Sequence, residues 1–181
     1  MRRVALIIAA ILLVMPATAY AEEIPQEVEE AAERIGAEYN VSPALIEAIC
    51  YEESRFTPQI VNKSGKNFGL MQVNPTYNTA RMERLGVTKE GLLTVEGNIL
   101  VATDLLAELF EQYDDACEAM MVYGGFSKAK IARYHRDGTM PAYIVRLLER
   151  AAKYEERRDG RDDTGAGESH ADGDQGDGLD G

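Results

Sequence analysis

Positively charged side chains are scarce in this sequence. Its 181 residues include 19 lysines and arginines against 31 aspartates and glutamates, for a formal net charge of −12. Residues 1–21 carry +2 and residues 159–181 carry −7, which leaves −7 on residues 22–158. Such a surface is a poor counterion for phosphate, so we expect no nucleic-acid partner. Bulk charge would not attract anionic lipid or wall polymer either, so recognition of such a surface would need a shaped groove.

Histidine is rarer still, and long apolar runs are absent after residue 21. His135 and His170 are the two histidines, and neither stands in a metal-ligand spacing. We therefore expect no metal, no cofactor and no metal-dependent hydrolase. Residues 22–181 contain no apolar stretch long enough to span a membrane.

The first 21 residues are typical of an export signal. Arg2 and Arg3 precede a 12-residue apolar run that Pro16 ends, and residues 19–21 (Ala-Tyr-Ala) match a small-x-small cleavage site. A membrane span needs about 20 apolar residues, and an uncleaved anchor is the alternative. We expect an exported, extracytoplasmic protein of the cell wall, the periplasm or the medium.

Cysteine occurs twice. In an exported protein Cys50 and Cys117 could form a persistent disulfide across 66 intervening residues, which would contribute about 4 kcal/mol on the chain-entropy model. The alternative is two buried free thiols. We favour the bridge, because it would tie the helix of residue 53 to the helix that ends at residue 123, two segments that the motifs below place side by side.

The chain between its ends shows helical periodicity nearly throughout. No alternating strand of five or more residues and no internal repeat is present, which predicts an all-α protein. We expect a single, monomeric domain over residues 22–158 and a disordered Gly- and Asp-rich tail over residues 159–181. The expected helices cover about residues 25–39, 43–55, 94–113, 117–123, 127–134 and 139–157.

Glu53 stands on the apolar face of the helix expected over residues 43–55. At about 100° per residue, four apolar side chains between residues 45 and 50 centre near 70°, and Glu53 falls at about 80°. Glu52 falls at the edge of this stripe and Glu47 faces water. Burial raises the pKa of a carboxyl, and a general acid must keep its proton near neutral pH. The alternative is a glutamate that simply emerges into solvent at the helix end.

A second carboxylate is missing from the segment that follows. Asp and Glu are absent from residue 54 to residue 75, and the next acid is Glu83. Most glycosidases use a pair of carboxylates. A single residue that acts first as acid and then as base, on a substrate that supplies its own nucleophile, fits this pattern.

Two motifs then resemble those of a known family. Residues 53–58 (Glu-Ser-Arg-Phe-Thr-Pro) are similar to the Glu-Ser-x-Phe-x-Pro motif of the SLT-type lytic transglycosylases, relatives of goose-type lysozyme, and residues 69–72 match their Gly-Leu-Met-Gln motif. Residues 122–125 (Val-Tyr-Gly-Gly) stand where the family has Ala-Tyr-Asn-x-Gly, and residues 141–145 resemble its closing Tyr-Val segment. The resemblance covers about residues 25–155.

The resemblance implies a lysozyme-like fold that cleaves the MurNAc-β-1,4-GlcNAc bond of peptidoglycan glycan strands and forms 1,6-anhydro ends. Glu53 would be the catalytic acid and base. Tyr123 would hydrogen-bond Glu53 and orient it, and Ser54 would support the helix end, although a core aromatic and a plain helix-terminal hydroxyl remain alternatives. The residues that would line the saccharide groove are Gln72, Met71 and Tyr143.

The sequence departs from the family pattern at two places. Gly124 replaces the asparagine of Ala-Tyr-Asn, which puts any contact of that side chain with substrate in doubt. The approach over residues 64–69 is similar to a variant found in transglycosylases of secretion and conjugation systems, which are therefore candidate partners. The rival functions are a hydrolytic muramidase that uses Glu83 as base and a non-catalytic wall-binding or assembly protein.

Overall fold

The structure, a computed structural model, describes residues 23–165, with side chains described to residue 160. Every named element in this range is a helix, and extended pairing is limited to isolated bridges that Phe68 makes with Val61 and Val73. The prediction of an all-α fold is confirmed. In chain order the helices are α2 (Gln26–Tyr39), α3 (Pro43–Ser54), α4 (Thr79–Leu85), the 3-10 helix η2 (Gly91–Leu93), α5 (Val95–Gln112), α6 (Ala116–Tyr123), α7 (Lys128–Asp137) and α8 (Ala142–Gly165).

Polar caps begin three of the helices, each close to the residue at which the helix was expected to begin. The Ser42 hydroxyl accepts a hydrogen bond from the Leu45 amide at 3.3 Å, with Pro43 at the first helical position. Thr94 caps α5 in the same way, and the Asp115 carboxylate accepts bonds from two amides of α6. The helices α4 and η2 are absent from the sequence prediction, because each is short and lacks a side-chain cap bond.

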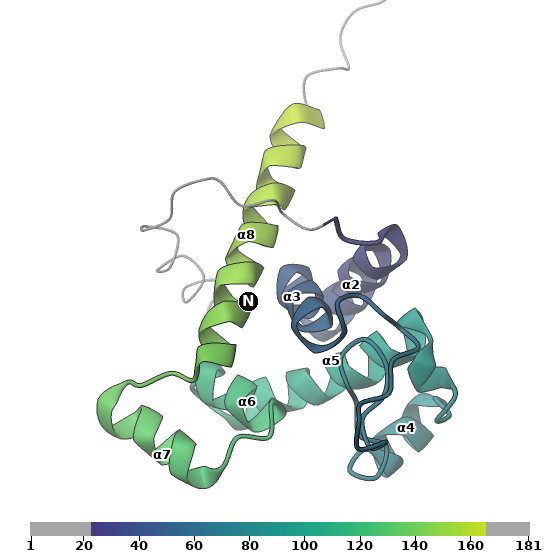
Figure 1. The fold of residues 1–181 in the computed structure, drawn as a ribbon. Helices are drawn as coiled ribbons and strands as arrows, with labels where there is room; N and C mark the ends of the chain where they lie inside the picture. The colour runs from purple at the N-terminus through teal and green to yellow at the C-terminus, as the bar shows by residue number, and fades with distance from the viewer. Residues whose placement is uncertain (1–22, 166–181) are drawn as a thin grey trace, which may run out of the picture.

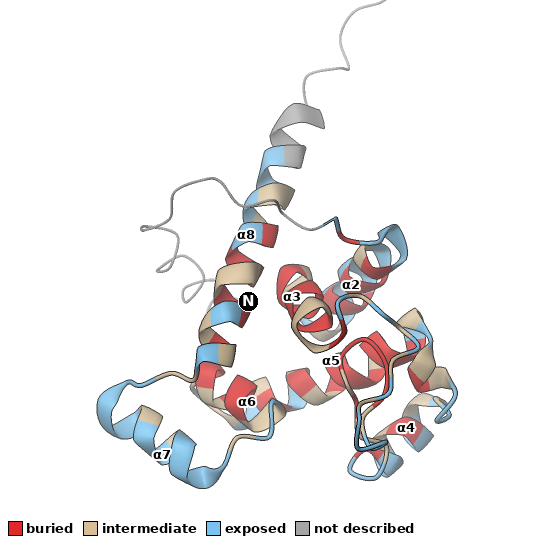
Figure 2. Ribbon diagram, viewed as in Figure 1, coloured by how far each residue is buried: buried red, intermediate tan, exposed pale blue. Residues whose placement is uncertain are grey.

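Helix α3 lies at the centre of the molecule (Figure 1), where α2 and the long α8 both pack against it. Each residue from Ala44 to Cys50 is buried, so α3 is enclosed on every side (Figure 2). Helix α5 packs against both α2 and α6 and completes the core.

Glu47 was expected to face water, and the structure corrects this. Its side chain is wholly buried and pairs with Arg158 of α8. The periodicity of the sequence predicts a single apolar stripe on α3, but the neighbouring helices cover its polar side as well. Burial raises the pKa of Glu47 to about 7, although the Arg158 guanidinium opposes this shift.

The two cysteines form no disulfide in the structure. Both are free and buried, so the expected bridge is not confirmed. Cys50 lies inside the core face of α3, whereas the Cys117 sulfur lies 3.9 Å from the Met140 sulfur. Packing of α3 and α6 in one core therefore occurs without a covalent link between these thiols.

The ends of the chain are only partly described. Helix α8 continues to Gly165, beyond residue 158, at which we expected the domain to end. The expected export signal and most of the acidic tail lie outside the described residues. Within residues 23–165 no helix is both long and apolar enough to cross a bilayer.

Candidate active site

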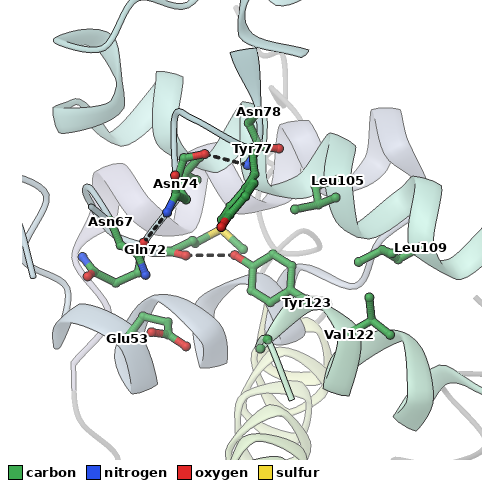
Figure 3. Close-up of a pocket in the computed structure, with 14 residues that line it drawn as sticks. Glu53, Asn67, Gln72, Asn74, Tyr77, Asn78, Leu105, Leu109, Val122 and Tyr123 are labelled. Atoms are coloured by element: carbon green, nitrogen blue, oxygen red, sulfur yellow. Dashed lines mark hydrogen bonds between the residues drawn. The ribbon is translucent and has the colours of Figure 1, made fainter. Parts of the chain in front are cut away.

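A groove of about 370 Å³ opens beside the C-terminal end of α3 (Figure 3). Glu53 forms one wall, and residues of α5 and of the end of α6 form the opposite wall. The remaining wall is the loop between α3 and α4, over residues 67–78. Among the described residues that line the groove, Glu53 is the single charged side chain.

The Glu53 carboxyl lies in a position that favours its protonated form. Burial is the largest influence and raises its pKa, and the negative charge of the neighbouring Glu52 raises it further. A hydrogen bond from Tyr143 acts in the opposite direction. The net effect is a raised pKa for a glutamate at the wall of an open groove, which is the state that proton donation requires.

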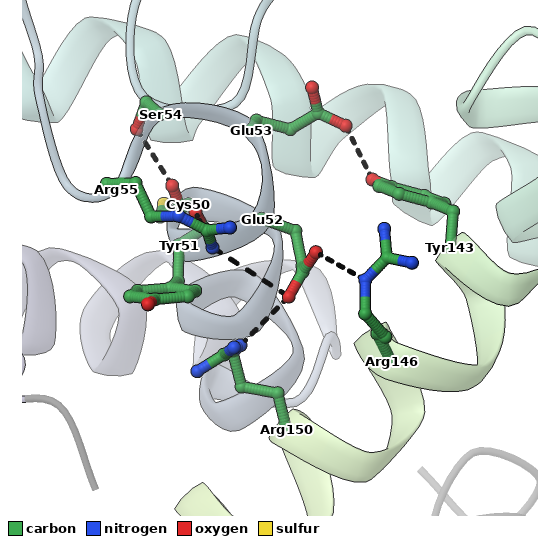
Figure 4. Close-up of polar contacts among 9 residues, drawn as sticks. All are labelled: Cys50, Tyr51, Glu52, Glu53, Ser54, Arg55, Tyr143, Arg146 and Arg150. Carbon is green, nitrogen blue, oxygen red and sulfur yellow. Dashed lines mark hydrogen bonds and ion pairs between the residues drawn. The ribbon is translucent and has the colours of Figure 1, made fainter. Parts of the chain in front are cut away.

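Tyr143, and not Tyr123, hydrogen-bonds Glu53. The Tyr143 hydroxyl donates to Oε1 of Glu53 at 2.5 Å (Figure 4). Tyr143 belongs to the first turn of α8, which packs along α3 and so brings this hydroxyl to the carboxyl. Burial and the negative Glu53 raise the pKa of Tyr143, so its hydroxyl remains a donor at neutral pH. Tyr143 was expected to line the saccharide groove; it lies instead behind the carboxyl.

Tyr123 has a different partner from the one expected. Its hydroxyl donates to the Met71 carbonyl oxygen at 2.9 Å, so it holds the groove loop against α6 (Figure 3). The ring nevertheless lines the groove close to Glu53, whose charge, after burial, raises the pKa of Tyr123. Tyr123 therefore lies at the groove, but its hydroxyl binds the loop, and Tyr143 of α8 contacts the Glu53 carboxyl instead.

The groove loop is held from beneath by Asn98 of α5, a residue that sequence reasoning missed. Its buried side chain accepts a hydrogen bond from the Met71 amide at 2.7 Å and donates to the carbonyl oxygens of Phe68 and Leu92 at 2.8 and 2.7 Å. Gly69 crosses this amide with a φ of +75°, and a Cβ there would lie 2.1 Å from the Asn98 nitrogen. The glycine of the Gly-Leu-Met-Gln motif is thus required by close packing.

The remaining residues expected at the site are distributed as follows. Gln72 and Met71 both line the groove, although Met71 is also almost wholly buried in the core. The Gln72 amide donates to the Gly69 carbonyl oxygen at 2.9 Å. Ser54 is buried, and its hydroxyl donates to the Cys50 carbonyl oxygen at 2.8 Å, so its contact is with the last turn of α3.

Two asparagines and an exposed tyrosine complete the groove and were also missed. The Asn74 amide donates to the Asn67 side-chain oxygen at 3.1 Å, which orients both amides at the groove wall. Tyr77 lines the groove and is 87% exposed (Figure 3). Its neighbours in the sequence carry no periodic pattern, so the sequence signal for it was only an aromatic residue shortly after the Gly-Leu-Met-Gln motif.

Glu52 does not line the groove and lies among arginines (Figure 4). Its carboxylate, 3% exposed, lies 3.1 Å from Arg150 and 3.3 Å from Arg146, both on α8. Tyr143, Arg146 and Arg150 follow one another at helical spacing, so one side of α8 contacts both glutamates. This contact fixes the end of α3 relative to the tyrosine that binds Glu53.

Known proteins resemble this chain both in sequence and in fold. Protein IpgF of Shigella flexneri and Protein IpgF of Shigella sonnei are each 28% identical to the chain over 102 residues, which cover 54% of this chain and 66% of theirs. The match thus spans just under two thirds of these relatives. A solved structure of an inactive mutant of the lytic transglycosylase Slt from Pseudomonas aeruginosa aligns with a TM-score of 0.65 at 16% identity, over 84% of this chain and 28% of that one, which shows a shared fold.

The family model described as the transglycosylase SLT domain matches residues 30–139. This range begins in α2 and ends after α7, so it includes Glu53, the groove loop and Tyr123. The resemblance seen in the motifs is confirmed, and the chain belongs to the transglycosylase SLT domain family.

Proposed function

We propose that the protein is an exported lytic transglycosylase that cleaves the β-1,4 bond between N-acetylmuramic acid and N-acetylglucosamine in peptidoglycan and leaves 1,6-anhydro ends. The observation that carries this proposal is the combination of a lone carboxyl with a raised pKa and a groove otherwise lined by neutral side chains. A neutral, amide-bearing groove suits a saccharide chain. Membership of the family supports the substrate.

In the first step the Glu53 carboxyl donates its proton to the glycosidic oxygen as the bond from that oxygen to the muramoyl C1 breaks. Tyr143 occupies Oε1, which leaves Oε2 to carry the transferred proton. The substrate's own N-acetyl group shelters the oxocarbenium-like C1.

In the second step the Glu53 carboxylate takes the proton of the muramoyl C6 hydroxyl while the C6 oxygen bonds to C1. The carboxyl regains its proton, no water is consumed, and the product is a 1,6-anhydro end. Hydrolysis on the same scaffold would need a base that activates water. Glu83 is exposed on α4 and does not line the groove, which argues against that alternative.

Residues 1–21 support export, since they match a cleavable signal, and peptidoglycan lies outside the cytoplasm. The approach to the Gly-Leu-Met-Gln motif supports a role beside a secretion or conjugation apparatus, where local opening of the wall would be required. After export the protein would act as a monomer.

The test is analysis by mass spectrometry of the muropeptides released from purified sacculi by the mature protein, by Glu53→Gln and by Glu83→Gln. We expect anhydro products from the wild type and from Glu83→Gln, and a loss of about 10³-fold or more in Glu53→Gln, because this variant lacks the acid of the first step and the base of the second. Far-UV circular dichroism and thermal melts check that both variants fold.

Other results would contradict the proposal. Reducing ends instead of anhydro ends would establish a hydrolase, and their loss in Glu83→Gln would identify its base. Undiminished release by Glu53→Gln would remove the catalytic role altogether and favour a wall-binding protein.

A further inference from the structure

Helix α7 is exposed and carries a local positive charge on an acidic protein. No described residue of α7 is buried, and the helix is mainly exposed in Figure 2. It carries Lys128, Lys130, Arg133 and Arg136 against the single acid Asp137, a net charge of +3 with histidine neutral. Asp137 lies at the C-terminal end of the helix, 3.1 Å from Arg136 and 3.7 Å from Arg133.

Beside this helix lies a second hollow of about 340 Å³, which we name the α7 hollow. Its walls are the rings of Phe126 and Tyr143, the short segment between α7 and α8 that includes Met140, and the side chains of Lys130 and Arg133. The Lys130 ammonium lies 5.1 Å from the centre of the Phe126 ring, and its described surroundings contain no ion pair with a carboxylate. Arg133 is 61% exposed.

The α7 hollow and the groove adjoin the same carboxyl. Tyr143, which lines the hollow, donates its hydrogen bond to Glu53, which lines the groove. Gly124 and Gly125 line the groove, and Phe126, the next residue, lines the hollow, with its ring 6.1 Å from the Tyr143 ring. The Tyr143 side chain therefore links the hollow to the Glu53 carboxyl.

The two sites differ in chemistry. The groove offers amides, hydroxyls and leucines beside a single carboxyl, which suits an uncharged sugar chain. The hollow combines two cations with apolar surface, which suits a ligand that carries both carboxylates and small apolar groups. In peptidoglycan each muramoyl unit carries a stem peptide with free carboxylates and alanine methyl groups, and this peptide is attached through the lactyl group at C3 of the same sugar ring whose C1 bond Glu53 would cleave.

We propose that the α7 hollow binds the stem peptide of the muramoyl residue at Glu53, an inference that rests on the proposed function. Lys130 and Arg133 pair with the peptide carboxylates, while Phe126 and Met140 contact its alanine methyl groups. The enzyme therefore distinguishes peptide-bearing glycan from glycan without peptides, and α7 supplies the attraction that the acidic body as a whole lacks.

The first experiment compares Lys130→Gln/Arg133→Gln with Lys128→Gln/Arg136→Gln. Both double variants remove two positive charges from exposed positions of the same helix, but only the first pair lines the hollow. The substrates are soluble muramoyl oligosaccharides with stem peptides and the same chains after an amidase has removed the peptides. We expect KM for the peptide-bearing chains to rise about tenfold in the first variant and to stay within twofold in the second, with no change for the peptide-free chains.

A binding measurement separates this inference from the proposed function. Calorimetric titration of the folded protein with a disaccharide-peptide and with the peptide-free disaccharide requires no turnover. We expect the wild type to prefer the peptide-bearing ligand at least about fivefold, and we expect Lys130→Gln/Arg133→Gln to lose that preference. Preference without cleavage would remove the proposed function and leave the stem-peptide site in place.

Three outcomes would overturn the inference. Equal affinity of the wild type for both ligands would show that the peptide is not recognised, even where cleavage proceeds. Equal losses in the two double variants would reduce the effect to the general charge of the helix. Charge-dependent binding to vesicles of phosphatidylglycerol, without preference for the muropeptide, would assign the cations to a membrane surface instead.

Discussion

At the residue scale, the protonation of Glu53 depends on its burial and on two neighbouring residues, and these influences act in different directions. Burial against the core of α3 and the charge of Glu52 raise its pKa, and the Tyr143 hydroxyl lowers it by stabilising the carboxylate. The effect of Tyr143 on this pKa comes from one group, its hydroxyl. Removing its hydroxyl should shift the pKa of Glu53 without leaving a large cavity.

We predict that Tyr143→Phe raises the pKa of Glu53 further, because the carboxylate loses a hydrogen bond that favours the charged form. The proposed mechanism requires protonated Glu53, so the rate should fall as pH rises through this pKa, and the alkaline limb of the profile of kcat/KM should move to higher pH by about half a unit to one unit. The measurement is the pH profile on soluble glycan. Tyr123→Phe is the control, since its hydroxyl binds the Met71 carbonyl, and an equal shift in the control would contradict the assignment.

Tyr77 gives a second test at this scale. Its exposed ring at the groove wall is suited to stack on a sugar, as aromatic side chains do at saccharide sites. Tyr77→Ala should raise KM about tenfold with little change in kcat, and Tyr77→Phe should retain the wild-type KM. Because the ring is exposed, the melting temperature should stay within about 1 °C in both variants. An unchanged KM in Tyr77→Ala would exclude the ring from binding.

At the scale of elements, the contact between α3 and α8 determines the site. One side of α8 contacts both Glu52 and Glu53, and further along the same helix Arg158 pairs with the buried Glu47 and the exposed Glu33. These pairs bring charged side chains into the interface between the buried helix α3 and the apolar side of α8. A buried pair of this kind is a sensitive point, because removal of one partner leaves the other charge uncompensated.

Glu47 should make the stability of this interface depend on pH. Its pKa is about 7 in the folded protein and near 4.5 when unfolded, so the native state holds a proton that the unfolded state releases between these values. The free energy of unfolding should therefore fall by about 1–3 kcal/mol from pH 4.5 to pH 7.5 through this group. Glu47→Gln should remove this decline in urea titrations, while Glu33→Gln should retain it. Parallel curves for the wild type and Glu47→Gln would contradict the prediction.

At the scale of the whole molecule, the core holds α3 and α6 together without a covalent bond. Cys50 and Cys117 are both free, and burial raises the pKa of each thiol, which keeps the reactive thiolate scarce at neutral pH. The two sulfurs have separate surroundings within one apolar core.

We predict that the purified mature protein contains two titratable thiols after denaturation without reductant and fewer than one in the native state within minutes. A reductant should leave the melting temperature within about 1 °C of its value without reductant, because no loop is closed by a bridge. The measurements are thiol titration with a coloured disulfide reagent and paired thermal melts. Zero thiols in the denatured protein, together with a fall in melting temperature on reduction, would establish the bridge that the sequence first suggested.

Local signals explain which parts of this architecture were predictable. Ser42-Pro43, Thr94 and Asp115 cap their helices through bonds that involve only neighbouring residues, so sequence is sufficient to locate these starts. Glu53, Gln72 and Met71, which short motifs carry, line one groove in the structure. Asn98 and Tyr77 could not be predicted from the sequence, because their contacts at the groove form only when the loop folds back over α5.

The sequence by itself determined the helical class, the caps, the acid at the end of α3 and the lack of a second nearby carboxylate, since each of these depends on spacing along one segment. Tertiary structure decided which tyrosine contacts Glu53, that Glu47 is buried against Arg158 and that the two thiols stay apart. The physical reason is that these contacts join residues far apart in the chain. The packing of α8 along α3 selects them, and no local periodicity encodes the position of α8.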